Sequence, residues 1–214
     1  MTFVNYDQFL EYMRLGGSIM WIILALSILA AAIVIERIIF FVFSSSNLKS
    51  FKKTLAGVFE GKSDRPVSAP KGSTRRLFFA ACESWNVADE ELSLRLEGEI
   101  RRELYKWERN LPFLEIITRV APLLGLLGTV VAMVEMFGSM EIGGAIDSQT
   151  ITGGIWKALL TTVAGLSVAI PTLIAHGFLI EAVSREEETL ERGVDFIMSN
   201  RSNFSRARRE GKAL

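Results

Sequence analysis

Apolar residues along the chain gather into three long blocks that polar segments separate. The first block runs from Ile19 to Phe43 and contains no charged residue before Glu36. The second block runs from Val120 to Phe137, and the third runs from Ile155 to Ile180. A helix needs about 20 apolar residues to cross the hydrocarbon core of a bilayer, and each block reaches or approaches that length. The pattern therefore predicts a membrane protein with three spanning helices.

The first block has a second possible interpretation, a cleavable signal peptide. A signal peptide begins with a basic leader and has a short apolar core. The leader here contains Asp7 and Glu11 beside Arg14, and the apolar run that follows is too long. We therefore interpret this block as a retained spanning helix.

Small residues distinguish the second and third blocks from the first. Such residues let helix backbones approach closely in lipid, where no hydrophobic force drives helices together. We expect helices two and three to pack inside an assembly and helix one to face lipid. The expected packing positions are Pro122, Gly125, Gly128, Gly165 and Pro171.

Basic residues predict the orientation of the chain. Lysine and arginine recur throughout residues 44–119 and 182–214, whereas the N-terminal leader has only Arg14 and residues 139–154 have none. Cytoplasmic segments carry the excess of basic residues, so the N-terminus is expected outside and the C-terminus in the cytoplasm. The expected order is an outer segment (1–17), a first span (18–43), a cytoplasmic helical region (44–119), a second span (120–138), an outer loop (139–154), a third span (155–181) and a cytoplasmic tail (182–214).

The segment between the first two blocks carries helical patterns of its own. A short helical stretch runs from Leu48 to Phe59, and a linker rich in proline, serine and glycine follows from Gly61 to Ser73. From Asp89 onward, apolar residues recur at three- and four-residue steps, which indicates one buried helix face and one solvated face. The apolar positions are Leu92, Leu96, Ile100, Leu104, Trp107 and Leu111; the charged positions are Glu99, Arg102, Glu103, Lys106 and Arg109.

Both cytoplasmic regions should be continuous with spanning helices. Leu111-Pro112 predicts a kink rather than an end, so the helix that begins at Asp89 should run on into the second span. The tail keeps an apolar stripe at helical spacing, so the third helix should project well beyond the membrane. That stripe is Ile180, Val183, Leu190, Val194 and Ile197. No strand-like alternation occurs, and we predict an all-α fold.

The sequence lacks the motifs that would indicate an enzyme. Positive and negative charges cancel, which gives no reason to expect nucleic acid as a partner. The single cysteine, Cys82, rules out an intramolecular disulfide. The chain has no P-loop, no dinucleotide-binding glycine turn and no metal-spaced Cys/His set. The one histidine, His176, could relay protons but is interpreted as an interfacial residue. We therefore predict no enzyme, no catalytic residue, no cofactor and no metal.

Polar and ionisable residues at membrane depth are the main functional signal. Such groups are costly in lipid and usually face a cavity, an ion pathway or each other. Thr129 and Glu135 lie in the second block, and Lys157, Thr161 and Thr162 lie in the third. A single threonine can bond back to its own helix. Threonines at similar depth on neighbouring antiparallel helices instead favour a pore lining made by Thr129, Thr162 and Thr161.

Two of the blocks resemble the signatures of a known family. The run from Ala121 to Val130 (APLLGLLGTV) resembles the second-helix signature of the MotA/TolQ/ExbB proton channel family. The run from Gly154 to Thr162 (GIWKALLTT), followed by Gly165-Leu166 and Ala169-Ile170-Pro171, resembles its third-helix signature. Glu36-Arg37, interface residues at the end of helix one, also fit. The ExbB/TolQ branch is the most similar, and the resemblance covers the three spans and their order.

The resemblance implies a proton-driven energy transducer in the bacterial inner membrane. It implies a homo-pentamer that encloses the helices of a small ExbD/TolR-like subunit, whose single span carries a protonatable aspartate. Thr129 and Thr162 match the pore-facing threonines of the family. Proton flow would move the small subunit and so drive a TonB- or TolA-like protein in biopolymer transport or envelope maintenance. Two other functions remain open: a non-conducting scaffold that holds partner helices, and a self-contained solute channel.

Lys157 departs from the family pattern, which usually has glutamate at this position. Counting along the helices, Glu135 lies about 9 Å and Lys157 about 7.5 Å outward from Thr129 and Thr162, at a rise of roughly 1.5 Å per residue. Two opposite charges at one depth offset much of the cost of burying either. We therefore predict an intramembrane pair of Glu135 and Lys157 that fixes packing near the outer mouth. The alternative is that both side chains reach the outer interface separately.

Overall fold

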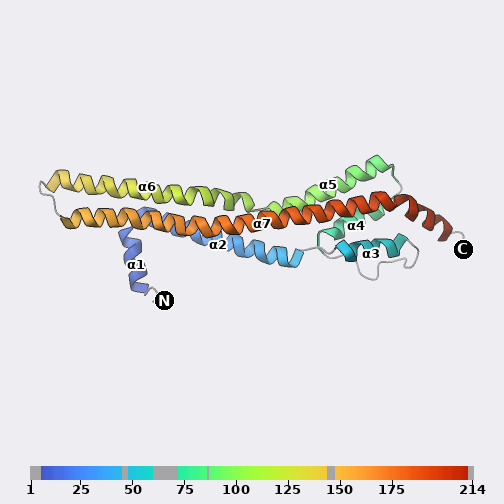
Figure 1. The fold of residues 1–214 in the computed structure, drawn as a ribbon, viewed down its shortest axis with the longest axis horizontal. Coiled ribbons are helices and arrows are strands. Elements are labelled where there is room, and N and C mark those ends of the chain that lie inside the picture. The colour runs from blue at the N-terminus through green and yellow to red at the C-terminus, as the bar shows by residue number, and fades with distance from the viewer. Residues whose placement is uncertain (1–5, 45–47, 60–71, 86, 144–147, 212–214) are drawn as a thin grey trace. The chain divides into compact units, whose positions relative to one another are not determined.

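The computed structural model describes residues 6–44, 48–59, 72–85, 87–143 and 148–211 (Figure 1). Within these ranges the regular secondary structure is entirely α-helical, as the sequence predicts. The helices are α1 (Tyr6–Leu15), α2 (Gly17–Ser44), α3 (Leu48–Phe59), α4 (Thr74–Glu83), α5 (Asp89–Glu108), α6 (Leu111–Gly143) and α7 (Ser148–Gly211).

Three helical regions of the described chain are long and apolar enough to cross a membrane. They are α2, the region from Asp89 to Ser139 whose apolar part is α6, and the region of α7 from Ser148 to Arg201. Their most apolar windows have mean hydropathies of 2.7, 2.0 and 1.9, and only a minority of each window is buried in the single chain. These features confirm a membrane protein with three candidate spanning helices.

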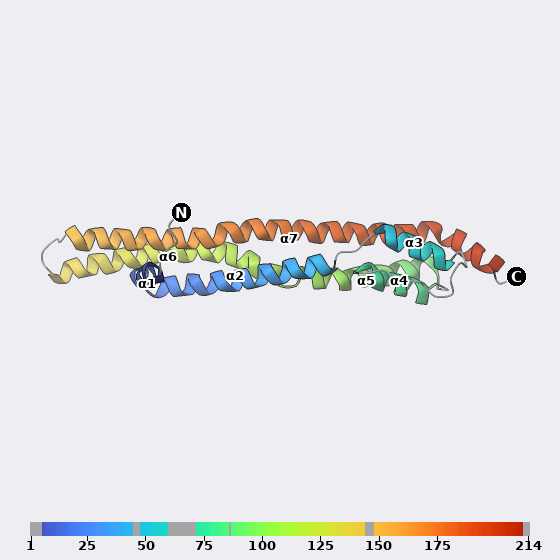
Figure 2. The same ribbon diagram turned by 90° about the horizontal axis from the view of Figure 1, so that it is seen from below.

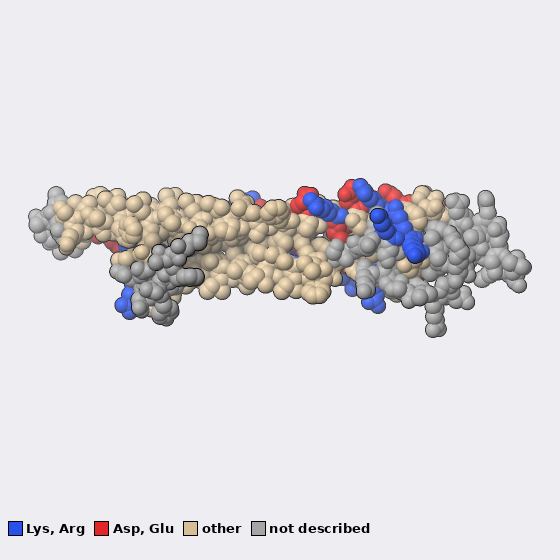
Figure 3. Space-filling model, turned by 60° about the horizontal axis from the view of Figure 1, so that its bottom comes forward, with Lys and Arg blue, Asp and Glu red and all other residues tan. Residues whose placement is uncertain are grey.

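The chain divides into two compact units. Unit 1 comprises residues 1–36 and 110–178, and unit 2 comprises residues 37–109 and 179–214. In unit 1, α6 lies antiparallel to the first half of α7, and the two helices run side by side in both ribbon views (Figures 1 and 2). The helix α1 turns away from the direction of α2 at a corner formed by Gly17, whose φ is +68°. The face in Figure 3 carries few charged side chains over unit 1.

Unit 2 has its own hydrophobic core, built where α3, α4 and α5 pack with the last part of α7. The apolar stripes predicted for residues 92–111 and 180–197 supply much of this core. Gly193 lets α7 approach α3 and α4 closely, because a Cβ there would lie 2.9 Å from Leu77 and 3.3 Å from Phe51. The core residues are Phe51, Leu55, Leu77, Phe78, Ala81, Trp85, Leu92, Leu96, Ile100, Leu190 and Ile197.

The prediction that α5 continues through a kink into the second span is wrong. The chain leaves the helix after Glu108, and Asn110 adopts a left-handed conformation with φ of +70°. A new helix begins at Leu111, so Pro112 lies in its first turn, where a missing N–H costs no hydrogen bond. The break therefore lies before the proline, at an asparagine that tolerates positive φ.

Other boundaries also differ from the sequence expectations. The expected outer loop at 139–154 is shorter, because α6 extends to Gly143 and α7 begins at Ser148. Two helices, α1 and α4, were not predicted, because each is only ten residues long. The predicted α3 has the expected bounds. The predicted linker from Gly61 to Ser73 lies mostly outside the described residues.

Candidate functional site

A seam of direct backbone contacts joins α6 to α7. A Cβ on Gly165 would lie 2.5 Å from the Ala121 carbonyl oxygen and 3.1 Å from the Gly125 Cα. A Cβ on Gly125 would lie 3.0 Å from the Thr161 carbonyl oxygen, and one on Gly128 would lie 2.6 Å from the Thr161 side chain. The three glycines named from the sequence therefore lie at one helix interface, where small residues allow close approach.

The two prolines expected at packing positions lie outside this set of contacts. Pro122 is half-buried within α6, and Pro171 is exposed on α7. Both helices continue through their prolines.

Thr129 and Thr162 both present half-buried hydroxyl groups beside the seam. The Thr129 hydroxyl donates to the Leu126 carbonyl of its own helix at 2.7 Å. The Thr162 hydroxyl instead donates across the interface, to the Gly125 carbonyl of α6 at 3.4 Å. One hydroxyl bonds locally and the other bonds to the neighbouring helix, and neither side chain is fully enclosed in the single chain.

Thr161 lies differently from the expectation that placed it along the ion pathway. Its side chain is fully buried, with 0% exposed, and its hydroxyl donates to the Ala158 carbonyl at 2.9 Å. It fills the space that Gly128 leaves open on α6. Thr161 is therefore a helix-packing residue rather than one that faces an open side.

Helical geometry places the threonines and the charged residues on opposite sides of α6 and α7. Each residue advances about 100° around a helix, so Thr129 and Glu135 lie about 120° apart on α6. By the same count, Thr162 and Lys157 lie about 140° apart on α7. Because the helices are antiparallel and face each other along the seam, both threonines fall on one side of this two-helix layer. Glu135 and Lys157 fall on the other side.

The Lys157 and Glu135 side chains meet in the structure. The Lys157 ammonium donates to the Glu135 carboxylate, and the two side chains are 24% and 57% exposed. The same ammonium nitrogen lies 3.5 Å from where a Cβ would stand on Gly17 of α2. The pair therefore lies on the side of the layer that α2 covers, beneath the corner between α1 and α2.

The neighbouring residues Glu36 and Arg37 make separate polar contacts. In unit 1, the Glu36 carboxylate accepts a hydrogen bond from the Asn110 amide at 3.4 Å. In unit 2, Arg37 is 1% exposed and donates to the carbonyls of Lys106 at 2.9 Å and Trp107 at 3.4 Å. Those carbonyls belong to the last turn of α5, where helix carbonyls have no intrahelical donors and a cation is favourable. Arg37 thus caps the end of α5 from another helix.

Two sets of ion pairs in unit 2 were not found from the sequence. Glu103, predicted on a solvated face, is buried between Arg76 of α4 at 2.9 Å and Lys106 at 2.7 Å. Arg201 of α7 forms an ion pair with Asp89 and donates to the Trp85 carbonyl at 3.0 Å. The Arg76–Glu103 and Arg201–Asp89 pairs have no local sequence signal, because each joins segments that are distant in the chain.

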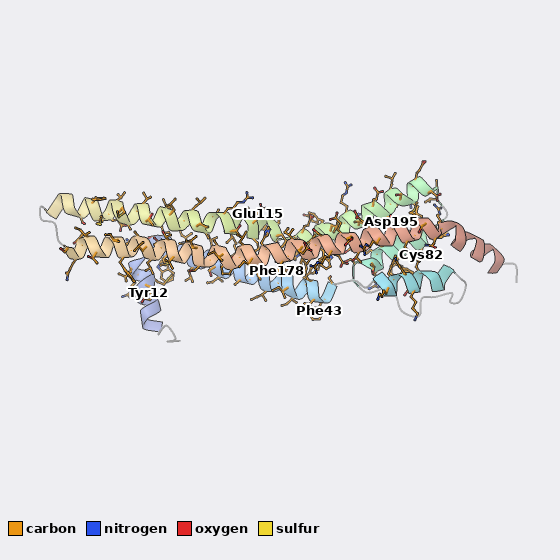
Figure 4. The ribbon with its side chains drawn as sticks, viewed as in Figure 1. Tyr12, Phe43, Cys82, Glu115, Phe178 and Asp195 are labelled. Atoms are coloured by element: carbon orange, nitrogen blue, oxygen red, sulfur yellow. The ribbon has the colours of Figure 1, made fainter. Side chains whose placement is uncertain are left out.

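The remaining candidates lie in ordinary surroundings. Cys82 on α4 is partly buried and packs against the core of unit 2 (Figure 4). His176 is half-buried on α7. Among the described residues, no group of histidine, cysteine, aspartate and glutamate side chains is arranged to hold a metal ion.

Comparison with known proteins gives a consistent assignment. The model of the MotA/TolQ/ExbB proton channel family matches residues 70–192, which is more than half of the chain. The ExbB-like 3 protein of Synechocystis sp. is 33% identical over 172 residues, covering 74% of this chain and 79% of that protein.

Relatives from both named groups of this branch match the chain. The biopolymer transport protein ExbB of Helicobacter pylori is 46% identical over 72 residues, covering 34% of this chain and 50% of that protein. The Tol-Pal system protein TolQ of Haemophilus influenzae is 24% identical over 206 residues, covering 88% of this chain and 90% of that protein. The chain therefore belongs to the MotA/TolQ/ExbB proton channel family, in its ExbB/TolQ branch, as a multi-pass membrane protein.

Proposed function

We propose that this chain is the channel-forming subunit of a proton-driven energy transducer in the bacterial inner membrane. The observation that carries the proposal is the pair of half-buried threonine hydroxyls, Thr129 and Thr162, on one side of the α6–α7 layer. A hydroxyl group at membrane depth is unfavourable where it faces lipid, whereas it can solvate an ion where it lines a pathway. That side is the one away from α2, since Lys157 and Gly17 lie on the other.

A single chain supplies only one wall of such a pathway, so the proposal includes a ring of copies. With the threonines toward the ring axis and α2 toward lipid, neighbouring copies meet through the outward faces of α6 and α7. Both faces are apolar and exposed in the single chain. They include Leu127, Val130 and Val134 on α6, and Val163, Ile170 and Ile174 on α7. A head-to-tail contact of this kind closes into a ring when the rotation between copies allows it, and five copies is the number that the resemblance to the family implies.

The proposed transducer has two partner proteins and one orientation in the membrane. The ring would enclose the span of an ExbD/TolR-like subunit that carries the protonatable aspartate, and a TonB- or TolA-like protein would receive the motion. Residues 1–17 and 139–154 would lie on the periplasmic side, and residues 44–119 and 182–214 in the cytoplasm. The basic residues of those two cytoplasmic segments support this orientation.

The test is proton flux in liposomes that contain this chain together with its single-span partner. Thr162→Val keeps the side-chain volume but removes the hydroxyl, so we expect proton flux to fall at least tenfold with assembly unchanged. Thr161→Val makes the same chemical change one residue away, at a fully buried position, and serves as the matched control. Equal flux from the Thr129→Val/Thr162→Val double variant and the wild type would remove the threonines from the pathway.

A second function, a non-conducting scaffold, is favoured by one observation. Lys157 stands where the resemblance leads one to expect glutamate, and its ion pair with Glu135 joins α7 to α6, which a scaffold requires and ion passage does not. If wild-type liposomes with both subunits conduct no protons although the complex assembles, the scaffold function replaces the channel.

A further inference from the structure

The Lys157 side chain pairs with one neighbouring helix of unit 1 and approaches two more. It extends from α7, its ammonium donates to Glu135 of α6, and it reaches the corner between α1 and α2. Gly17 makes this approach possible, because its φ of +68° bends the chain and its missing side chain leaves room for the ammonium. An ammonium has three donors, and Glu135 uses one of them. The carbonyl groups at the end of α1 lack donors within their own helix and carry partial negative charge, which attracts a nearby ammonium.

The corner itself is tightly packed. Gly16 donates its backbone N–H to the Tyr12 carbonyl at 3.0 Å, and a Cβ on Gly16 would meet the Met20 side chain at 2.7 Å. Met13 on α1 is buried, at 3% exposed. The last turn of α1 therefore packs against the rest of unit 1, although the start of α1 points away from it (Figure 1).

The Lys157–Glu135 pair lies on the opposite side of the α6–α7 layer from Thr129 and Thr162. Lys157 is about 140° around α7 from Thr162, and only about 40° from the buried Thr161. An ion that passes along the threonine side would therefore not meet the Lys157 ammonium. The position of the pair fits a role in holding helices together better than a role in ion passage.

We propose that Lys157 is a positioning residue, which holds the α1–α2 corner against the outer ends of α6 and α7 through its charge. Glu135 neutralises the ammonium so that it can lie among apolar helices, and the ammonium fixes the corner. Removal of the charge frees α1 to change its angle to α6. This inference concerns the arrangement of helices, so it holds whether or not the chain conducts ions.

The experiment measures the distance between α1 and α6 in the full chain, assembled with its single-span partner in lipid nanodiscs. Nitroxide labels are attached at Tyr12→Cys on α1 and Ser139→Cys on α6, both at exposed positions, with Cys82→Ser as background (Figure 4). Diluting labelled with unlabelled chains restricts the signal to distances within one chain. Pulsed electron paramagnetic resonance then gives the distance distribution.

Three substitutions distinguish the effect of the Lys157 charge from the effect of its side-chain size. Lys157→Met removes the charge and keeps an unbranched chain, so the distribution should at least double in width. Lys157→Arg keeps the charge and should keep the wild-type distribution. Arg119→Met breaks an ion pair with Glu115 that lies within α6 alone, and it should change nothing.

Each alternative outcome overturns the proposal. An unchanged distribution in Lys157→Met would mean that the ammonium does not hold the corner. Equal broadening in Lys157→Arg and Lys157→Met would mean that side-chain shape, and not charge, is decisive. Loss of proton flux in Lys157→Met with an unchanged distribution would place Lys157 in the ion pathway instead.

Discussion

Replacing Gly165 by alanine adds one methyl group where α7 meets the backbone of α6. The new Cβ would lie 2.5 Å from the Ala121 carbonyl oxygen, 3.1 Å from the Gly125 Cα and 3.2 Å from the Gly125 nitrogen. All three are backbone atoms, which no change of side-chain rotamer can move away. Van der Waals contact is restored only if the helices separate by roughly 1 Å. The substitution therefore tests whether the seam sets the distance between α6 and α7.

The magnitude follows from two opposing effects. A clash with a carbonyl oxygen at 2.5 Å belongs at the upper end of overpacking costs, ~3 kcal/mol. Alanine is a better helix former than glycine, which offsets ~1 kcal/mol. We expect Gly165→Ala to lower the free energy of unfolding by ~2 kcal/mol. Gly177→Ala on the same helix is the matched control, because no heavy atom beyond its own stretch of helix lies within 4 Å of its new Cβ.

The assay is unfolding of the purified chain in mixed micelles with increasing SDS, followed by tryptophan fluorescence. Gly165→Ala should unfold at a lower SDS fraction than the wild type, and Gly177→Ala at an equal or higher one. The shift of α7 should also lengthen the bond from Thr162 to the Gly125 carbonyl, so proton flux should fall in the first variant alone. Equal SDS midpoints for the two alanine variants would mean that the seam does not set the distance between α6 and α7.

Two further predictions concern the buried arginine and the assembly. Arg37→Met removes two hydrogen bonds from a charged donor to α5 carbonyls and should cost ~3 kcal/mol of stability, whereas Arg102→Met breaks an exposed pair and should cost under ~1 kcal/mol. Equal SDS midpoints for these variants would contradict the capping role of Arg37. Native mass spectrometry of the detergent-purified complex should give five copies of the chain, and a dimer or tetramer would contradict the proposed ring.

The helices of this chain were largely predictable because their signals are local. Long apolar blocks and three- and four-residue spacing depend on residues within one helix, so α2, α3, α5 and the span in α6 could be placed from the sequence. The break at Asn110 could not be placed from the sequence, because asparagine accepts left-handed and right-handed conformations alike. The nearby Pro112 predicted a kink two residues too late. The short α1 and α4 have too few turns for a periodic signal to stand out.

The candidate site also has features that the sequence predicted and features that it did not. Small residues in two antiparallel spans predicted the seam, and counting from Thr129 and Thr162 put Glu135 and Lys157 at one depth. The side of each helix that faces α2 depends on the packing of a third element, so the approach of Lys157 to Gly17 could not be predicted from residues within one helix. The burial of Thr161 and Glu103 was missed for the same reason, since Gly128 and Arg76 belong to other helices.

The arginines at the two ends of α5 have a consequence for how unit 2 opens. Isolated helices fray from their ends, and local opening of proteins commonly starts there. In α5, Arg37 holds the last carbonyls, and Arg201 holds the turn that precedes the first residues. Fraying at either end would require α2 or α7 to release its arginine first. The hydrogen-bonded amides at both ends of α5, from Leu92 onward, should therefore exchange as slowly as those in its middle, as part of one cooperative opening of unit 2.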